Sequence, residues 1–137
     1  MKRLTGKTAL VTGAARGLGA ETARALAAEG ARVAISDVDG RGAEALAEQL
    51  RASGAQAIGF RQDVVDEAGW DEAARRIREE LGPLDVLVNN AGILLVKPVT
   101  ETTLDDFRRV MAINVDAVFL GTRCAFREMG KRGGVII

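Results

Sequence analysis

Near the amino terminus lies TALVTGAARGLG, residues 8–19, in which a short apolar run leads into three closely spaced glycines. The run from Thr8 to Thr12 contains β-branched residues, so it predicts a buried strand. The residues after it have helical character, and glycine tolerates the tight turn that joins the two elements. Because the first N–H groups of a helix lack partners and carry its positive end, the turn is a candidate pyrophosphate site.

The candidate ligands of this turn are Gly13, Arg16, Gly17, Leu18 and Gly19, of which Arg16 could add a positive charge. A tight turn without any ligand is one alternative, since motifs of this kind are loose. An ATP-type phosphate loop on residues 6–8 is rejected, because its leading glycine would have to stand at Met1 and because the triplet precedes the strand.

The rest of the chain alternates short apolar runs with longer segments of helical period. This alternation predicts an α/β protein with a Rossmann-type, doubly wound parallel sheet. Further strands are expected at residues 32–36, 56–61, 84–88 and 135–137. Apolar residues at helical spacing in 43–50 and 70–81 predict two helices that cover the sheet, and residues 100–129 hold one long helix or two joined with an offset. Gly30, Gly54 and Gly82 are expected to end helices.

A carboxylate, Asp37, ends the second expected strand about twenty residues beyond the glycines, where dinucleotide-binding proteins hold the adenosine ribose. Asp37 and the adjacent Val38 are therefore assigned to the cofactor site. A carboxylate there would repel a 2′-phosphate, so NAD is favoured; NADP is the alternative, because Arg16 could approach that phosphate. The alternative without a ligand is that Asp37 is solvated and caps the next helix. A calcium loop at residues 37–40 is rejected, because its glycine comes too early.

Together with later segments, these residues resemble those of the short-chain dehydrogenase/reductase family over the whole chain. The glycine turn has the family's T-G-x-x-x-G-x-G spacing, and residues 89–92 match its N-N-A-G motif. The resemblance implies that Asn90, Ala91 and Gly92 stabilise the sheet and line the nicotinamide-ribose side of a cleft. It implies also that Asp63 and Val64 contact adenine, through a carboxylate and a backbone N–H. All these segments follow strands, at the edge where open α/β sheets bind ligands.

Asn114 is expected to lie among apolar neighbours, because it shares a helical face with Phe107, Val110, Met111 and Val118. An unpaired buried amide would cost about 1–3 kcal/mol. From the residues alone, the simplest interpretation is that Asn114 bonds a nearby backbone carbonyl and kinks the helix. The family resemblance implies a catalytic role as well, in which Asn114 holds a backbone and a water of a proton relay.

The resemblance also implies a catalytic serine after the fifth strand, and a tyrosine followed four positions later by a lysine, none of which is present. Ser36 and Ser53 lie in the wrong elements, and tyrosine is absent. The chain ends on an apolar strand, so we expect a dinucleotide-binding domain over residues 1–137 that is truncated after the fifth strand. Such a chain is expected to be inactive and, with an open sheet edge, poorly soluble.

Composition excludes several classes of function. Acidic and basic residues balance at 19 each and are interspersed, so neither nucleic acid nor a membrane surface is an expected partner. Histidine is absent and Cys124 is the only cysteine, so no disulfide and no metal are expected. A cytoplasmic protein is expected, because no stretch could span a bilayer and no signal peptide is evident.

The predicted function is that of an NAD-dependent oxidoreductase, which transfers hydride between an alcohol or ketone and the nicotinamide. This chain would hold its cofactor-binding half. The alternative is a catalytically inactive sensor or regulatory protein that binds a dinucleotide. The resemblance implies a homodimer or homotetramer, with a helix near residues 104–129 at an interface. Residues 93–96 are left open as an apolar wall of the substrate site or as packing under the next helix.

Overall fold

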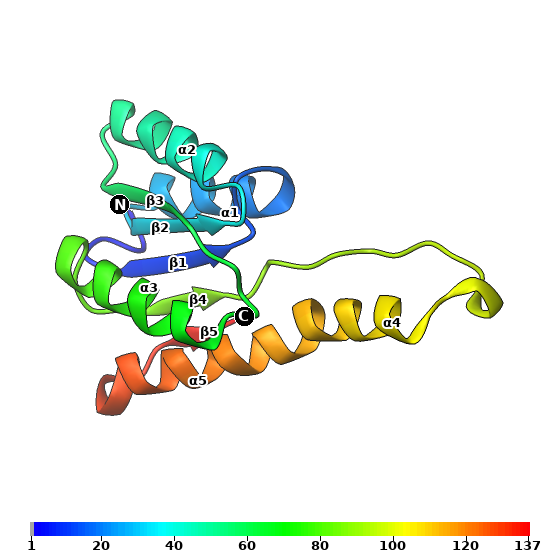
Figure 1. Ribbon diagram of the computed structural model, residues 1–137. Coiled ribbons are helices and arrows are strands. Elements are labelled where there is room, and N and C mark those ends of the chain that lie inside the picture. The colour runs from blue at the N-terminus through cyan, green and yellow to red at the C-terminus, as the bar shows by residue number, and fades with distance from the viewer. Residues whose placement is uncertain (1) are drawn as a thin grey trace.

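The computed structural model describes residues 2–137, so Met1, the first residue of the predicted domain, lies outside the described residues. Five strands form one parallel sheet in the order β3-β2-β1-β4-β5, which confirms the predicted Rossmann-type α/β fold (Figure 1). The strands are β1 (Thr8–Thr12), β2 (Arg32–Asp37), β3 (Ala57–Arg61), β4 (Val86–Val88) and β5 (Val135–Ile136). The helices are α1 (Gly17–Ala28), α2 (Gly40–Ala52), α3 (Glu67–Glu80), α4 (Leu104–Met111) and α5 (Ala117–Met129).

Some observed strand ends differ from the expected ones, because pairing with a neighbouring strand determines where a strand begins and ends. β2 extends to Asp37, which pairs with Arg61 of β3. β4 starts only at Val86, where its pairing with Ala9 of β1 begins. The three glycines expected to end helices have φ values of 91°, 91° and 98°, which confirms them as left-handed helix ends: Gly30, Gly54 and Gly82.

The sheet has a hydrophobic core on each face, and helices cover both faces (Figure 1). Helices α1 and α2 cover one face, where the alanines of α1 and Leu46 and Leu50 of α2 pack on Val11, Val33 and Ile35. Helices α3 and α5 cover the other face around Leu10, Trp70, Ile77 and Leu87. Strand β1 lies between β2 and β4 and is buried along its whole length, as expected of a central parallel strand.

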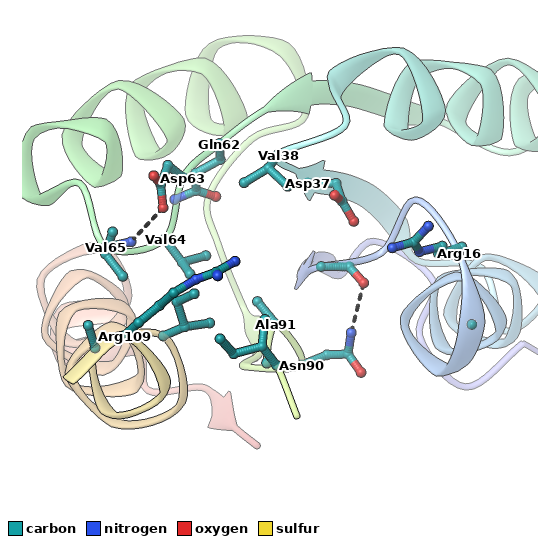
Figure 2. A pocket seen from close by; sticks show the side chains of 16 residues that line it. Arg16, Asp37, Val38, Gln62, Asp63, Val64, Val65, Asn90, Ala91 and Arg109 are labelled. Carbon is teal, nitrogen blue, oxygen red and sulfur yellow. Dashed lines mark hydrogen bonds between the residues drawn. The ribbon is translucent and has the colours of Figure 1, made fainter. Parts of the chain in front are cut away.

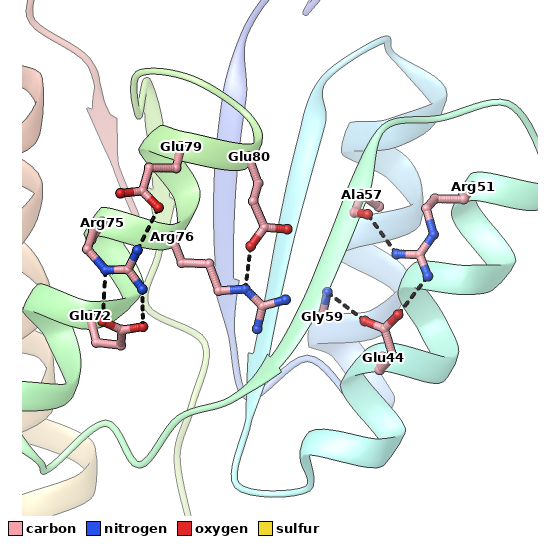
Figure 3. A network of polar contacts seen from close by, with 9 residues as sticks. All are labelled: Glu44, Arg51, Ala57, Gly59, Glu72, Arg75, Arg76, Glu79 and Glu80. Carbon is pink, nitrogen blue, oxygen red and sulfur yellow. Dashed lines mark hydrogen bonds and ion pairs between the residues drawn. The ribbon is translucent and has the colours of Figure 1, made fainter.

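Strand β3 forms one edge of the sheet, and side chains of α2 bond its outward-facing backbone groups (Figure 3). Glu44 accepts a hydrogen bond from Gly59 N at 3.2 Å, and Arg51 donates one to Ala57 O at 2.9 Å. Glu44 and Arg51 also pair with each other at 2.7 Å. This edge therefore offers fewer free backbone groups to another strand than a bare edge would.

Helices α4 and α5 form one helical run, because a π-helical segment, Ala112–Asp116, joins them. Its amino-terminal part projects beyond the sheet (Figure 1). The expectation that Asn114 lies in a buried apolar face is wrong, because Asn114 is exposed and Phe107 is 55 % exposed. The reason is the projection: α4 extends beyond the sheet, so the sheet does not cover this face (Figure 1).

The segment between β4 and α4 has no regular structure until a short 3₁₀ turn, Val99–Glu101, and it runs out beside α4 (Figure 1). Leu94 and Val96 are each 87 % exposed, so these two residues do not pack under the next helix. A capping box begins α4, in which Thr103 accepts a hydrogen bond from Asp106 N and Asp106 from Thr103 N. None of the described helices combines the length and apolar character needed to cross a membrane.

Gly59 allows α2 to lie directly on β3, which predicts a large cost for any side chain there. A Cβ at Gly59 would lie 2.5 Å from the Ala43 carbonyl carbon and from Glu44 Cα, which are backbone atoms that cannot move aside. We expect Gly59→Ala to lower the free energy of unfolding by about 2–3 kcal/mol in urea denaturation.

The matched control is Gly69→Ala in α3, whose Cβ would meet only the flexible Asp66 side chain, at 3.2 Å from its Oδ2. Because alanine favours helix, this control should raise the free energy of unfolding by up to about 1 kcal/mol. Equal effects of the two substitutions would contradict the packing described for Gly59.

The hydrogen bond from Lys97, at 2.8 Å, and that from Thr103 N lower the pKa of Asp106 to about 2. A lowered pKa means that the carboxylate stabilises the start of α4 above its ordinary value of 3.8, and that this contribution is lost as the pH falls through about 2. In an NMR titration of the carboxyl carbon, Lys97→Met should move the midpoint upward toward 3.8. A midpoint that Lys97→Met leaves unchanged would contradict this assignment.

Candidate functional site

A cleft of about 700 Å³ opens at the carboxyl ends of the strands (Figure 2). Ten of the residues predicted for a cofactor line it: Gly13, Arg16, Gly17, Asp37, Val38, Asp63, Val64, Asn90, Ala91 and Gly92. They come from the ends of β1 to β4, which the parallel sheet brings to one edge. This is the place where open α/β sheets hold ligands.

The glycine turn is shaped by backbone conformation and by crowding. Gly13 and Gly17 have φ values of 60° and 62°, in the region that side chains disfavour. A Cβ at Gly13 would lie 2.7 Å from Ala91 Cα, and one at Gly19 would lie 2.6 Å from Gly13 O. The turn therefore brings two segments into direct backbone contact, which only glycine permits.

Helix α1 begins at this turn with its first N–H groups free of a side-chain cap, because its N-cap residue, Arg16, makes no such hydrogen bond. The N–H groups of the first helical turn have no intrahelical partner, and they carry the positive end of the helix. The amino end of α1 thus has the features that a pyrophosphate needs.

Hydrogen bonds hold the turn after β1 against the segment after β4. The Thr12 hydroxyl accepts hydrogen bonds from Asn90 N and Ala91 N, both at 3.1 Å. The Asn90 side-chain amide donates to Thr12 O and Gly13 O, both at 2.9 Å. The Asn90 side chain therefore fixes the relative position of two walls of the cleft.

The Asp37 carboxylate is held at the end of β2 by two backbone groups. Its oxygens accept hydrogen bonds from Ala15 N at 3.0 Å and from Asp39 N at 2.9 Å. It does not cap α2; Asp39 does, by accepting a hydrogen bond from Gly42 N at 3.0 Å. Each carboxylate oxygen keeps a second lone pair, so Asp37 can still accept hydrogen bonds from a ligand.

Asp63 and Val64 lie on the opposite wall of the cleft (Figure 2). The Asp63 carboxylate accepts a hydrogen bond from Val65 N at 3.2 Å. The carbonyl of Val64 accepts one from the buried indole of Trp70 at 2.9 Å, so the hydrophobic core positions this wall.

Asn114 bonds the backbone of Ile93 in both directions. Its carbonyl oxygen accepts from Ile93 N and its amide nitrogen donates to Ile93 O, both at 2.9 Å. Asn114 belongs to the π-helical segment. The simplest interpretation of the sequence, that Asn114 bonds a backbone carbonyl where the helix is distorted, agrees with this arrangement. Asn114 itself does not line the cleft, although Ile93 does.

Two other predicted ligands also lie off the cleft wall. Leu18 is 83 % exposed, and Gly19 is buried against Asn90 and Gly13. Both belong to the first turn of α1, so their contribution there is limited to backbone N–H groups.

Ile93, from the segment left open as an apolar wall, lines the cleft, and so do five residues that the sequence did not point to: Gln62, Val65, Arg109, Ala112 and Ile113. Gln62 directly precedes the Asp63-Val64 pair, and this adjacency was the available signal. Arg109 reaches across the cleft from α4 (Figure 2). Its position depends on where α4 lies relative to the sheet, for which the sequence gives no local pattern.

The charges of the lining residues are separated along the cleft. Arg16 lies near Asp37 at the glycine turn, and Arg109 lies near Val64 on the other wall (Figure 2). Apolar side chains, among them Val38 and Val64, separate these groups. A ligand that carries anionic groups beside flat apolar rings would suit such a lining.

Comparison with known proteins shows which sequences this chain resembles. Residues 7–137 match the family model described as short chain dehydrogenase. A 3-beta-hydroxysteroid dehydrogenase of Comamonas testosteroni is 43 % identical over 98 % of this chain and 52 % of its own length. A D-threitol dehydrogenase of Mycolicibacterium smegmatis is 44 % identical over 96 % of this chain and 51 % of its own length.

A solved structure gives the same result for the fold. The crystal structure of a short-chain type dehydrogenase/reductase from Mycobacterium marinum superposes with a TM-score of 0.92 at 35 % sequence identity. It is matched over 97 % of this chain and 53 % of that protein's chain. The chain thus spans about half the length of the relatives it matches.

Thr12 is 1 % exposed and its hydroxyl satisfies two backbone N–H groups, which predicts a specific cost for removal of the hydroxyl. Thr12→Val keeps the shape but leaves both N–H groups without this acceptor, so the free energy of unfolding should fall by about 1–3 kcal/mol. Thr22→Val is the control, since the Thr22 hydroxyl bonds only Leu18 O on the surface of α1. In urea denaturation the control should stay within about 0.5 kcal/mol of the parent; a similar loss in both variants would contradict the proposed contact.

Proposed function

Since the chain belongs to the short-chain dehydrogenase/reductase family, we propose that it is the dinucleotide-binding domain, residues 1–137, of an oxidoreductase that uses NAD. One observation carries the proposal: the free amino end of α1, the Asp37 carboxylate and the Asp63-Val64 segment all border one cleft. Their order along the cleft fits the parts of a dinucleotide, with an anion site between two regions that can take a nucleoside.

In this proposal the α1 N–H groups and Arg16 bind the pyrophosphate, and Asp37 accepts hydrogen bonds from the adenosine ribose. Asp63 and Val64 contact adenine. Asn90, Ala91 and Gly92 border the nicotinamide-ribose side. The anchored Asp37 carboxylate disfavours a 2′-phosphate, which supports NAD over NADP.

The nicotinamide, when bound, would exchange a hydride with the carbon that bears the oxygen of an alcohol or ketone. The residues of this chain would position the cofactor and shape the cleft. Asn114 is proposed as a positioning residue that holds the backbone of Ile93 for a proton relay. With no tyrosine and no histidine in the sequence, residues 1–137 by themselves are proposed to bind the cofactor without turnover.

Two further elements of the proposal concern partners. Names of the relatives point to an alcohol as substrate, since they include dehydrogenases of threitol, sorbitol and cyclopentanol. The exposed apolar residues of α4 and α5, such as Phe107 and Phe119, favour a homodimer or homotetramer with these helices at an interface.

Cofactor binding tests the proposal directly. Titration of the protein with NADH, followed by nicotinamide fluorescence, should show saturable binding that ADP-ribose displaces. Gly13→Val should abolish it, because a Cβ at Gly13 meets Ala91 Cα at 2.7 Å. A folded parent protein that binds neither NADH nor ADP-ribose would overturn the proposed function.

Cofactor preference is a separate prediction. Asp37→Ser removes the negative charge from the ribose site, so the ratio of the Kd for NADP to that for NAD should fall by about tenfold, equivalent to about 1.4 kcal/mol. Asp39→Ser is the matched control, because serine still caps α2. Unchanged discrimination in Asp37→Ser, or the same change in the control, would argue against the assignment of Asp37.

A further inference from the structure

Gln62 is a buried polar side chain whose hydrogen-bonding atoms are not satisfied within residues 2–137. The residue is only 5 % exposed, and neither its amide nitrogen nor its amide oxygen has a hydrogen-bond partner among residues 2–137. Its backbone is already used, since Gln62 N donates to Asp37 O at 2.9 Å. The side chain therefore makes no polar contribution to the fold as it stands.

The position of Gln62 distinguishes it from the other buried groups that lack partners. Ser36 Oγ and Arg32 Nε also have none among the described residues, but neither residue lines the cleft. Gln62 does line it, and its amide lies between the side chains of Asp63 and Val38 (Figure 2). An amide in the wall of a binding cleft with no partner among residues 2–137 has its donor and its acceptor available to a ligand.

The chemistry of the amide narrows the kind of ligand. A glutamine amide presents one acceptor and one donor side by side, and this pair matches the amino group and ring nitrogen N7 of adenine. The neighbouring Asp63 and Val64 are proposed above to take the other edge of the same base. The amino group of adenine has two hydrogens, so the two contacts do not compete.

We propose that the Gln62 side chain turns into the cleft and binds the N6–N7 edge of adenine, which makes Gln62 a residue that selects adenine among cofactor bases. This inference rests on the proposed function, because it requires a dinucleotide in the cleft. The rotation breaks no hydrogen bond, since the amide has none in its present position. The ligand would then satisfy both amide atoms together.

The test compares three ligands on the full chain: NAD, its hypoxanthine analogue, and its 7-deazaadenine analogue, in which carbon replaces N7. The parent protein should bind NAD about tenfold more tightly than the 7-deaza analogue, because the analogue leaves the buried amide N–H without an acceptor. Gln62→Met, which keeps the length of the side chain and removes both polar atoms, should bind these two ligands equally. The preference for adenine over hypoxanthine should fall in this variant without vanishing, because Asp63 remains.

The control is Gln49→Met, since Gln49 lies on α2 away from the cleft and pairs with Arg24. It should keep the ligand preferences of the parent. If the parent binds NAD and the 7-deaza analogue equally, Gln62 does not contact N7 and the inference is overturned, whether or not the variant folds. If the parent binds none of the dinucleotides, the proposed function itself fails, so the two failures are distinguishable.

Discussion

The contact between Thr12 and Asn90 joins the two segments on which the cleft depends. The hydroxyl of Thr12 accepts from two N–H groups after β4, while the Asn90 amide donates to two carbonyls after β1. Adjacent parallel strands bring these ends together, but only the side-chain bonds set their spacing. Gly13 and Gly19 are required because that spacing leaves no room for a Cβ.

The remaining walls of the cleft are fixed by groups outside it. Ala15 N and Asp39 N hold the carboxylate of Asp37, and the buried indole of Trp70 holds the carbonyl of Val64. When backbone groups and the core already hold the binding residues in place, these residues lose little conformational entropy as a cofactor binds. Gln62 is the exception, since no group among residues 2–137 bonds its side-chain amide.

Local chemistry was sufficient to place the glycine turn and Asp37 at the cleft, because each combines a strand end with a suitable residue type, whereas the segment at Asn90 was placed there by the family resemblance. The sequence was misleading for the face that contains Asn114 and Phe107. Apolar spacing on a helix predicts a buried face only if another element covers it, and α4 projects beyond the sheet. Gln62 and Arg109 were not predicted as site residues. A polar residue beside a strand or on a helix is common, and only its neighbours in the fold show that it lines a cleft.

Local patterns thus established the α/β class, the positions of the five strands, the glycine ends of the helices and the family resemblance. Such features depend on periodicity and on backbone chemistry, which act over a few residues. The bond between Thr12 and Asn90, the two-way contact of Asn114 with Ile93, and the unpaired amide of Gln62 emerged only from the folded chain. Each depends on groups that are far apart in sequence or on the absence of a neighbour, and only packing of the whole sheet and its helices determines which groups meet.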